Sequence, residues 1–357
     1  MIIHNHKSFT FLILALVFSH LMSCQYSSTN PEALDNYLVS NETLTTIAFG
    51  SCNDEDKPQP LWDVIRAVNP DLWIWTGDNI YADTEEQAVF RAKYEKQLAN
   101  PDYQRFTANL PFMTGTWDDH DYGANDGGAE YPMKEVAKSE MYRFLNVTED
   151  DPSVGRSGTQ RAYLYGPQGR RVKVILLDTR WFRDPIERTE GENQEYLPNE
   201  TGTVLGEEQW AWLERELAAN EAEVHLIISS IQVIAFEHRF EKWANFPNEL
   251  QRFYDLIVKT NPAKPVVISG DRHAGEISAV LLDGLSAPLY DITSSGLTNV
   301  WSRMFDEVNS KAVTPKVIEP NYGLVEIKWP VEGSTEQSPI VKLSLRNDMG
   351  VLHHVTL

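Results

Sequence analysis

Apolar runs long enough to form buried strands alternate with helical patterns along this chain, and three of the runs end in acidic turns. The run 72–76 leads into Gly77-Asp78, the run 112–117 into Asp118-Asp119-His120-Asp121, and the run 265–269 into Gly270-Asp271-Arg272-His273. This βα alternation predicts an α/β fold built on largely buried strands. Because ligands collect at strand ends in such folds, the acidic turns predict one shared site that binds metal.

The spacing of apolar residues predicts the main elements. The expected strands are 46–50, 71–77, 112–117, 172–177, 224–229 and 265–270, and the expected helices are 60–68, 85–98, 206–220 and 248–260. Residues 323–329 and 340–345 alternate apolar and polar side chains, and a turn at 347–350 leads to a last strand, 351–357. This alternation predicts an antiparallel hairpin at a sheet edge. We therefore expect one domain, 44–357, of two packed sheets with outer helices.

The first residues are typical of an export signal. Lys7 precedes an apolar run from Phe9 to Val17, which is too short to span a membrane, so we expect a signal peptide over 1–23. Residues 21–24 resemble the lipobox of bacterial lipoproteins, which would make Cys24 the lipidated first residue of the mature protein. Alternatively, the signal peptide is cleaved elsewhere and Cys24 is incidental. Residues 24–43 predict a flexible tether, and we expect a lipoprotein on the periplasmic side of an outer membrane or at the cell surface.

Charge and cysteine content narrow the chemistry. The formal net charge of -21 argues against a nucleic-acid partner, because such binding needs clustered Lys and Arg. With Cys24 acylated, Cys52 has no disulfide partner, which is unusual in an exported protein. Cys52 is then either a small buried apolar residue or a metal ligand, and the acidic turns favour ligation. Nothing in the sequence indicates the oligomeric state.

Several side chains in the acidic turns are candidate ligands. Asp78 offers oxygen to a hard cation, and Tyr81, one turn later, could reach the same ion if it were ferric iron. The alternative is that Asp78 caps a helix and Tyr81 packs in the core. In the second turn, Asp119 and His120 are favoured as the inward pair, because neighbouring side chains point in different directions.

The third acidic turn offers two further candidates. The i, i+2 spacing of Asp271 and His273 would place both side chains on one side of an extended segment. A pair of ordinary surface residues is the alternative, and the position directly after a strand favours ligation.

The chain resembles the alkaline phosphatase D family of metallophosphoesterases. The matching segments occur in family order over about residues 47 to 276, and together they are far more specific than any one alone. They are Gly50-Ser51-Cys52, Gly77-Asp78-Asn79-Ile80-Tyr81, Trp117-Asp118-Asp119-His120, Leu177-Asp178-Thr179-Arg180, the helix start at 205–213 and Gly270-Asp271-Arg272-His273.

The resemblance implies a four-layer α/β/β/α metallophosphoesterase sandwich with a metal site. Asp78 would bridge metals, with Cys52 and Tyr81 beside it on Fe³⁺. Asp119, Asp271 and His273 would complete a site that also accommodates Ca²⁺. The resemblance further implies that His120 lies near the leaving group and that Arg180 or Arg272 contacts phosphate.

The expected function is metal-dependent hydrolysis of phosphoesters outside the cytoplasm, by an alkaline phosphatase or phosphodiesterase. Clustered metals would lower the pKa of a bound water and hold hydroxide in line with phosphorus, and His120 would protonate the leaving alkoxide. The substrate would be a small phosphoester or a phospholipid, and the protein would contact the membrane only through its lipid anchor.

Two alternatives stay open, a phospholipase D-type phosphodiesterase and a non-catalytic binding lipoprotein stabilised by calcium. Cys52 and Tyr81 distinguish the calcium-stabilised module from an enzyme, because structural calcium takes oxygen ligands and has little use for a thiolate.

Overall fold

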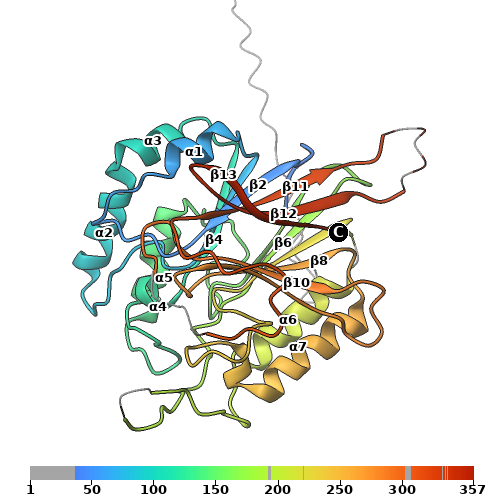
Figure 1. Cartoon of the computed structure of the whole chain (residues 1–357). Coiled ribbons are helices and arrows are strands. Elements are labelled where there is room, and N and C mark those ends of the chain that lie inside the picture. Colours follow the sequence, from blue (N-terminus) through green and yellow to red (C-terminus); the bar gives the residue numbers. More distant parts are fainter. Residues whose placement is uncertain are drawn as a thin grey trace, which may run out of the picture. The chain divides into compact units, whose positions relative to one another are not determined.

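The computed structural model describes residues 37–191, 194–219, 221–301, 307–331, 333, 335 and 337–357 (Figure 1). The predicted signal peptide, Cys24 and the predicted tether up to residue 36 lie outside the described residues. Strand β1 (Tyr37–Ser40) falls within 24–43, where we expected a flexible tether, and it pairs in parallel with β5 (Arg161–Tyr165). That part of the tether prediction is wrong, because backbone pairing makes 37–40 a strand of the sheet.

The first sheet has seven strands in the order β1-β5-β6-β7-β8-β10-β9. Four central strands run parallel. Strand β5 is parallel to β1 but antiparallel to the central strand on its other side, and β9 is antiparallel to its neighbour. These strands are β6 (Val172–Leu176), β7 (Val224–Ile228), β8 (Pro265–Ser269), β10 (Leu289–Ser294) and β9 (Gly275–Val280).

The second sheet has six strands in the order β13-β12-β11-β2-β3-β4. Its parallel part is β2 (Thr46–Gly50), β3 (Leu72–Thr76) and β4 (Phe112–Thr116), and its antiparallel part is β11 (Tyr322–Lys328), β12 (Ile340–Asn347) and β13 (Gly350–Thr356). The predicted C-terminal hairpin is confirmed, since β12 and β13 form the antiparallel edge of this sheet.

Helices cover the outer face of each sheet, which completes four layers, α/β/β/α (Figure 1). The second sheet carries α1 (Trp62–Ala67), α2 (Gln87–Ala99), α3 (Pro101–Thr107), α4 (Asp119–Tyr122) and α5 (Lys134–Phe144), and the first sheet carries α6 (Gly206–Ala218), the short 3-10 helix η1 (Trp243–Asn245) and α7 (Pro247–Thr260). Among the described residues, no helix has the length and apolarity needed to cross a bilayer.

Alternate residues of each central strand face different layers, as the period of a strand requires. In β3, Leu72 and Ile74 pack between the two sheets, whereas Trp73 and Trp75 pack against α1 and its neighbours. All five residues of each of β3, β6 and β7 are buried, which explains why these strands are mostly apolar, the exceptions being Thr76, Lys173 and His225. The carboxyl ends of β2, β3, β4 and β8 are thereby held at fixed positions in the two sheets.

Candidate metal centre

The turns that follow β3, β4 and β8 are brought together by two glycines. A Cβ added at Gly77, whose φ is +100°, would lie 2.5 Å from Cβ of Asp118, so the turn after β3 rests directly on the turn after β4. A Cβ at Gly270 would lie 2.5 Å from Oγ of Ser51, so the turn after β8 rests on the turn after β2. Glycine at these two positions therefore allows turns from both sheets to meet.

Four of the predicted ligands adopt left-handed backbone conformations. The φ angles are +57° at Cys52, +49° at Asp78, +68° at Asp271 and +52° at His273. Non-glycine residues in this region are uncommon, and they cluster at functional sites. The prediction that Asp271 and His273 face one side of an extended segment is wrong, because 271–273 form a turn and the two side chains join different groups of potential ligands.

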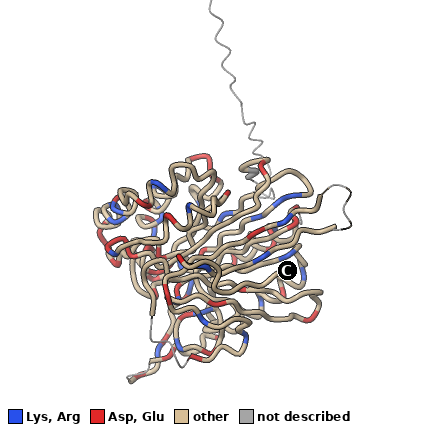
Figure 2. Tube along the Cα trace, turned by 45° about the horizontal axis from the view of Figure 1, so that its top comes forward, with Lys and Arg blue, Asp and Glu red and all other residues tan. Residues whose placement is uncertain are grey.

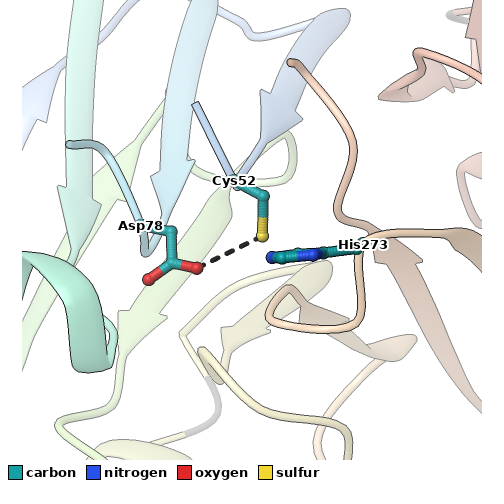
Figure 3. Close-up of side chains that lie close together, drawn as sticks. All are labelled: Cys52, Asp78 and His273. Carbon is teal, nitrogen blue, oxygen red and sulfur yellow. Dashed lines mark hydrogen bonds between the residues drawn. The ribbon is translucent and has the colours of Figure 1, made fainter. Parts of the chain in front are cut away.

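The first group joins Cys52, Asp78 and His273, whose potential ligand atoms all lie within 4.8 Å of one another (Figure 3). The Cys52 thiol donates to Oδ2 of Asp78 at 3.3 Å. The Tyr81 hydroxyl donates to the same oxygen at 3.3 Å and lies 3.1 Å from Nε2 of His273. No helix begins in the turn after Asp78, so this aspartate is not a helix cap. The structure thus brings a thiol, a phenol, a carboxylate and an imidazole around one point.

Two further groups extend this cluster. The second group joins Asp78, Asp119 and His120, and the third joins Asp118, Asp119 and Asp271. Within each group the potential ligand atoms again lie within 4.8 Å of one another. The backbone N–H of His120 donates to Oδ1 of Asp78 at 3.3 Å and to Oδ1 of Asp119 at 2.9 Å. Because Asp78 and Asp119 are each shared by two groups, the three groups form one continuous centre.

Burial opposes ionisation of most acidic groups in the cluster. Asp78 and Asp119 are 0% and 2% exposed, respectively. Burial raises the pKa of Asp78 and of Asp271 well above the usual range, and burial raises the pKa of the Cys52 thiol to about 12. Burial acts in the same sense on Asp119, but attraction to His120 and Arg180 brings its pKa to about 2. Bound cations would ionise these groups, as metal ligation requires.

One atom in particular fits a metal. Oδ2 of Asp118 is buried without a hydrogen-bond partner in the described part of the chain, while Oδ1 accepts from Nε of Arg180 at 2.6 Å and from Oγ of Ser230 at 2.7 Å. An orphaned carboxylate oxygen in such a place is costly unless something binds it. Asp118 lies in one group with Asp119 and Asp271, which makes its unpartnered oxygen a candidate donor to a cation shared with them.

His120 lies at the edge of the centre with its orientation set by Asp83. Nδ1 of His120 is 2.8 and 2.9 Å from the two carboxylate oxygens of Asp83, and its ring lies 4.2 Å from the Tyr81 ring. Burial lowers the pKa of His120, but the carboxylates of Asp78, Asp119 and Asp83 outweigh burial and raise it to about 11. His120 is thus held in its protonated form in the absence of bound cations.

A cavity of about 350 Å³ opens beside this centre. Asp119, His120, Asp271 and His273 form one part of its wall. Acidic and basic residues are interspersed along the described trace (Figure 2). The rest of the cavity wall also includes both signs of charge, namely Arg188, Arg239 and Arg272 together with Asp126 and Glu241. Nη2 of Arg272 donates to Oε2 of Glu307 at 2.7 Å, which holds the guanidinium at the wall.

Arg180, one of the two arginines predicted to contact phosphate, lies among buried acidic side chains. Its side chain is fully buried and does not line the cavity, because Nε donates to Asp118 at 2.6 Å and Nη1 to Glu241 at 2.6 Å. Arg180 holds Asp118 in place instead, so of the two predicted arginines only Arg272 faces the cavity.

Sequence reasoning missed several residues of the site. Asp118 lies in the same acidic turn as Asp119, but spacing alone did not show that both carboxylates point inward. Asp83 carried no signal of its own, although it follows Tyr81 by only two positions. Glu241 and Arg188 lie in segments without a recognisable sequence motif, and only the tertiary structure places them at the cavity wall.

Comparisons with known proteins agree with this geometry. The family model for PhoD-like phosphatases matches residues 47–353. Alkaline phosphatase D of Bacillus subtilis (strain 168) is 20% identical over 246 residues, which cover 62% of this chain and 42% of that relative. The chain therefore spans about two fifths of the length of this curated relative.

Solved structures support the fold. A structure of PhoD superposes with a TM-score of 0.65 at 18% identity, covering 88% of this chain and 72% of that one. A dimetal phosphatase from Danio rerio gives a TM-score of 0.54 at 12% identity, covering 88% of this chain and 99% of that one. These neighbours share the metallophosphoesterase sandwich, and the family match spans most of the chain. The chain belongs to the PhoD-like phosphatase family.

Proposed function

We propose that this protein is a metal-dependent hydrolase of small phosphoesters. The observation that carries the proposal is the convergence of Asp78, Asp119 and Asp271 with Cys52 and His273 beside a cavity walled by Arg272. Family membership and the curated relative support the same activity. The cavity, at about 350 Å³, lies near the lower end of the size range of small-molecule sites.

The donor atoms indicate which cations would bind. Cys52, Tyr81 and His273 together with Asp78 offer sulfur, phenol, imidazole and carboxylate donors, a set that suits Fe³⁺. The oxygens of Asp118, Asp119 and Asp271 suit a hard cation such as Ca²⁺. Bound there, cations would neutralise phosphoryl charge and make water more acidic.

The protein's own side chains supply positioning and proton transfer. The Arg272 guanidinium at the cavity wall is placed to bind a phosphoryl oxygen, and its planar fork suits that geometry. Asp83 holds Nδ1 of His120, so Nε2 is the ring nitrogen left to deliver a proton to the leaving oxygen. Cations bound at Asp78 and Asp119 would weaken the attraction that raises the pKa of His120 and so make it a stronger acid.

The N-terminal sequence supports action outside the cytoplasm. We propose export and anchoring through Cys24, on the periplasmic side of an outer membrane or at the cell surface. Its test is cell fractionation: a Cys24→Ala variant that still sediments with membranes would argue against the anchor.

Asp78→Asn tests the hydrolase directly. We expect turnover of chromogenic phosphomonoesters and phosphodiesters to fall by about a hundredfold or more. Residues that only hydrogen-bond to metal ligands typically contribute tenfold to a hundredfold, and Asp78 is itself a proposed ligand. The matched control is Asp283→Asn, which changes an exposed aspartate outside the cavity lining. Retained turnover in Asp78→Asn would refute the assignment.

Elemental analysis and a substrate panel separate the alternatives. Iron with a visible charge-transfer band that Cys52→Ser or Tyr81→Phe shifts would support the proposed donor set. Calcium alone, with no hydrolysis, would favour a non-catalytic binding module. Preferential cleavage of phospholipids over soluble esters would favour the phospholipase D-type alternative.

A further inference from the structure

Two aromatic side chains, Phe240 and Trp301, form part of the cavity wall beside the candidate metal centre, and we call this pair the aromatic shelf. Their rings lie 4.8 Å apart at 72°, and the Trp301 ring lies 5.6 Å from the His273 ring. The backbone N–H of Trp301 donates to the carbonyl of His273 at 3.0 Å, which ties the shelf to a predicted ligand. Trp301 is 42% exposed, so much of its apolar surface is available to a ligand in the cavity.

We propose that the aromatic shelf binds a planar aromatic ring in the alcohol part of the substrate, an inference that rests on the proposed hydrolase function. An alcohol whose phosphoryl group lies beside Arg272, at cations that Asp119 and Asp271 would hold, would extend along the same wall toward the shelf. Aromatic rings gain from stacked or edge-on contact with each other, beyond the apolar area they bury. The preferred substrates are therefore phosphoesters of alcohols that carry an aryl ring or a nucleobase.

Charge on the shelf argues against a choline ester. Aromatic side chains attract quaternary ammonium groups through their ring faces. Here Cζ of Arg272 lies 4.4 Å and Cζ of Arg239 lies 5.0 Å from the centroid of Phe240, so guanidinium groups already occupy that interaction. The nearby carboxylates do not provide an alternative site for a quaternary ammonium group, because Glu241 is paired with Arg180 and Arg183, and Asp126 with Arg188. A neutral ring fits beside these cations better than a second cation does.

Matched ester pairs test the shelf without changing the leaving oxygen. Benzyl phosphate is compared with cyclohexylmethyl phosphate, and adenosine 5′-monophosphate with ribose 5-phosphate, on the metal-loaded protein, with phosphocholine as a fifth substrate. We expect KM for each ring-bearing ester to be about tenfold below that of its partner, which is within the range for stacking on one aromatic side chain. The pair with the larger ratio identifies whether aryl or nucleobase rings are bound better.

Variants connect the preference to the shelf. Trp301→Ala should abolish the KM difference within each pair, and Trp301→Phe should keep most of that difference. Phe236→Ala is the matched control, because Phe236 is an exposed aromatic in the segment that carries Phe240 and does not line the cavity. Equal KM values within each pair, a preference that survives Trp301→Ala, or the lowest KM for phosphocholine would each overturn the proposal.

A binding measurement separates failure of the shelf from failure of the hydrolase. Calorimetric titration with benzylphosphonate and cyclohexylmethylphosphonate needs no turnover. Tighter binding of the benzyl compound, with the difference lost in Trp301→Ala, would support the shelf whether or not the esters are hydrolysed. Failure to hydrolyse any of the esters would refute the hydrolase. Equal binding of the two phosphonates would refute the shelf alone.

Discussion

At the scale of single residues, a charged side chain near the site can serve either structure or chemistry, and burial decides which. Arg180 and Arg272 both lie in the segments that resemble the phosphatase family. Arg180 is enclosed between Asp118 and Glu241, whereas Arg272 reaches the cavity wall. Arg180 therefore acts by holding Asp118, whose other oxygen remains available to a cation.

Arg180→Met tests this structural role. Removing the guanidinium leaves Asp118 and Glu241 buried without their counter-charge, so we expect the free energy of unfolding to fall by about 3–5 kcal/mol. Urea denaturation measures this change. The control Arg66→Met removes an exposed arginine paired with Asp63 at 3.3 Å and should cost less than about 1 kcal/mol. Equal stability of Arg180→Met and the parent protein would contradict the buried network.

At the scale of elements, one carboxylate joins the turns after β3 and β4. Oδ1 of Asp121, in α4, accepts from the backbone N–H of Asp118 at 2.6 Å and of Asp78 at 3.3 Å, and Oδ2 accepts from that of Asn79 at 3.1 Å. Asp121 is completely buried, so these N–H groups have no access to bulk water. The short helix thus fixes the turn that carries Asp78 relative to the turn that carries Asp119.

Asp121→Ala should loosen both turns at once. The expected loss is roughly 2–4 kcal/mol of unfolding free energy, because three buried N–H donors lose their acceptor. Bound metal per chain should also fall, since Asp78 and Asp119 lose their relative position. Thermal unfolding and elemental analysis measure the two effects. A variant that lost stability but kept full metal content would show that α4 does not position the ligands.

Buried polar residues also explain which elements sequence periodicity did not predict. Strand β10 contains Asp291 and Thr293, which are buried, and Asp291 accepts from Oγ of Ser269 at 2.7 Å and from the N–H of Val233 at 2.8 Å. Such a strand has no apolar period, so β10 and its antiparallel neighbour β9 were not expected. The strands that were expected, such as β3 and β6, consist mostly of apolar residues.

At the scale of the whole molecule, the centre exists only where the two sheets meet. Cys52, Asp78 and Asp119 follow strands of the second sheet, and Asp271 and His273 follow β8 of the first. The bridge between Ser51 and Ser295 and the hydrogen bond from Ser51 N–H to the carbonyl of Ser294, at 3.2 Å, join the sheets beside the centre. Packing of the sheets therefore brings acidic groups from both into one buried volume.

The stability of the whole fold should depend on pH and on bound cations together. Burial raises the pKa of Asp78 and Asp271 well above the usual range and that of Asp118 to about 7. A folded-state pKa above the unfolded value means that the folded state retains protons the unfolded state has released, so stability falls as pH rises through the folded-state pKa. Between about pH 6.5 and 8.5, the chelated protein should lose about 1.4 kcal/mol per pH unit for each retained proton.

Chemical denaturation across this pH range, with and without chelator, measures the effect. Saturating cations should reduce the slope, because bound cations keep the carboxylates ionised and bind the folded state selectively. A chelated protein whose stability stayed constant or rose from about pH 6.5 to 8.5 would contradict the buried acidic cluster.

The sequence by itself determined the α/β class, the central strands other than β10, four of the helices and the acidic turns, because these depend on local periodicity and on residue types within a few positions. Only the tertiary structure decided how the candidate ligands group, that Asp118 points inward, that Arg180 is structural, and that Phe240 and Trp301 share a wall. The partners in these contacts are far apart in the chain: Arg180 and Asp118 are separated by 62 residues, and Cys52 and Ser295 by 243. Local patterns carry no information about such pairs, whose contacts form when two sheets pack and turns with left-handed conformations orient the side chains.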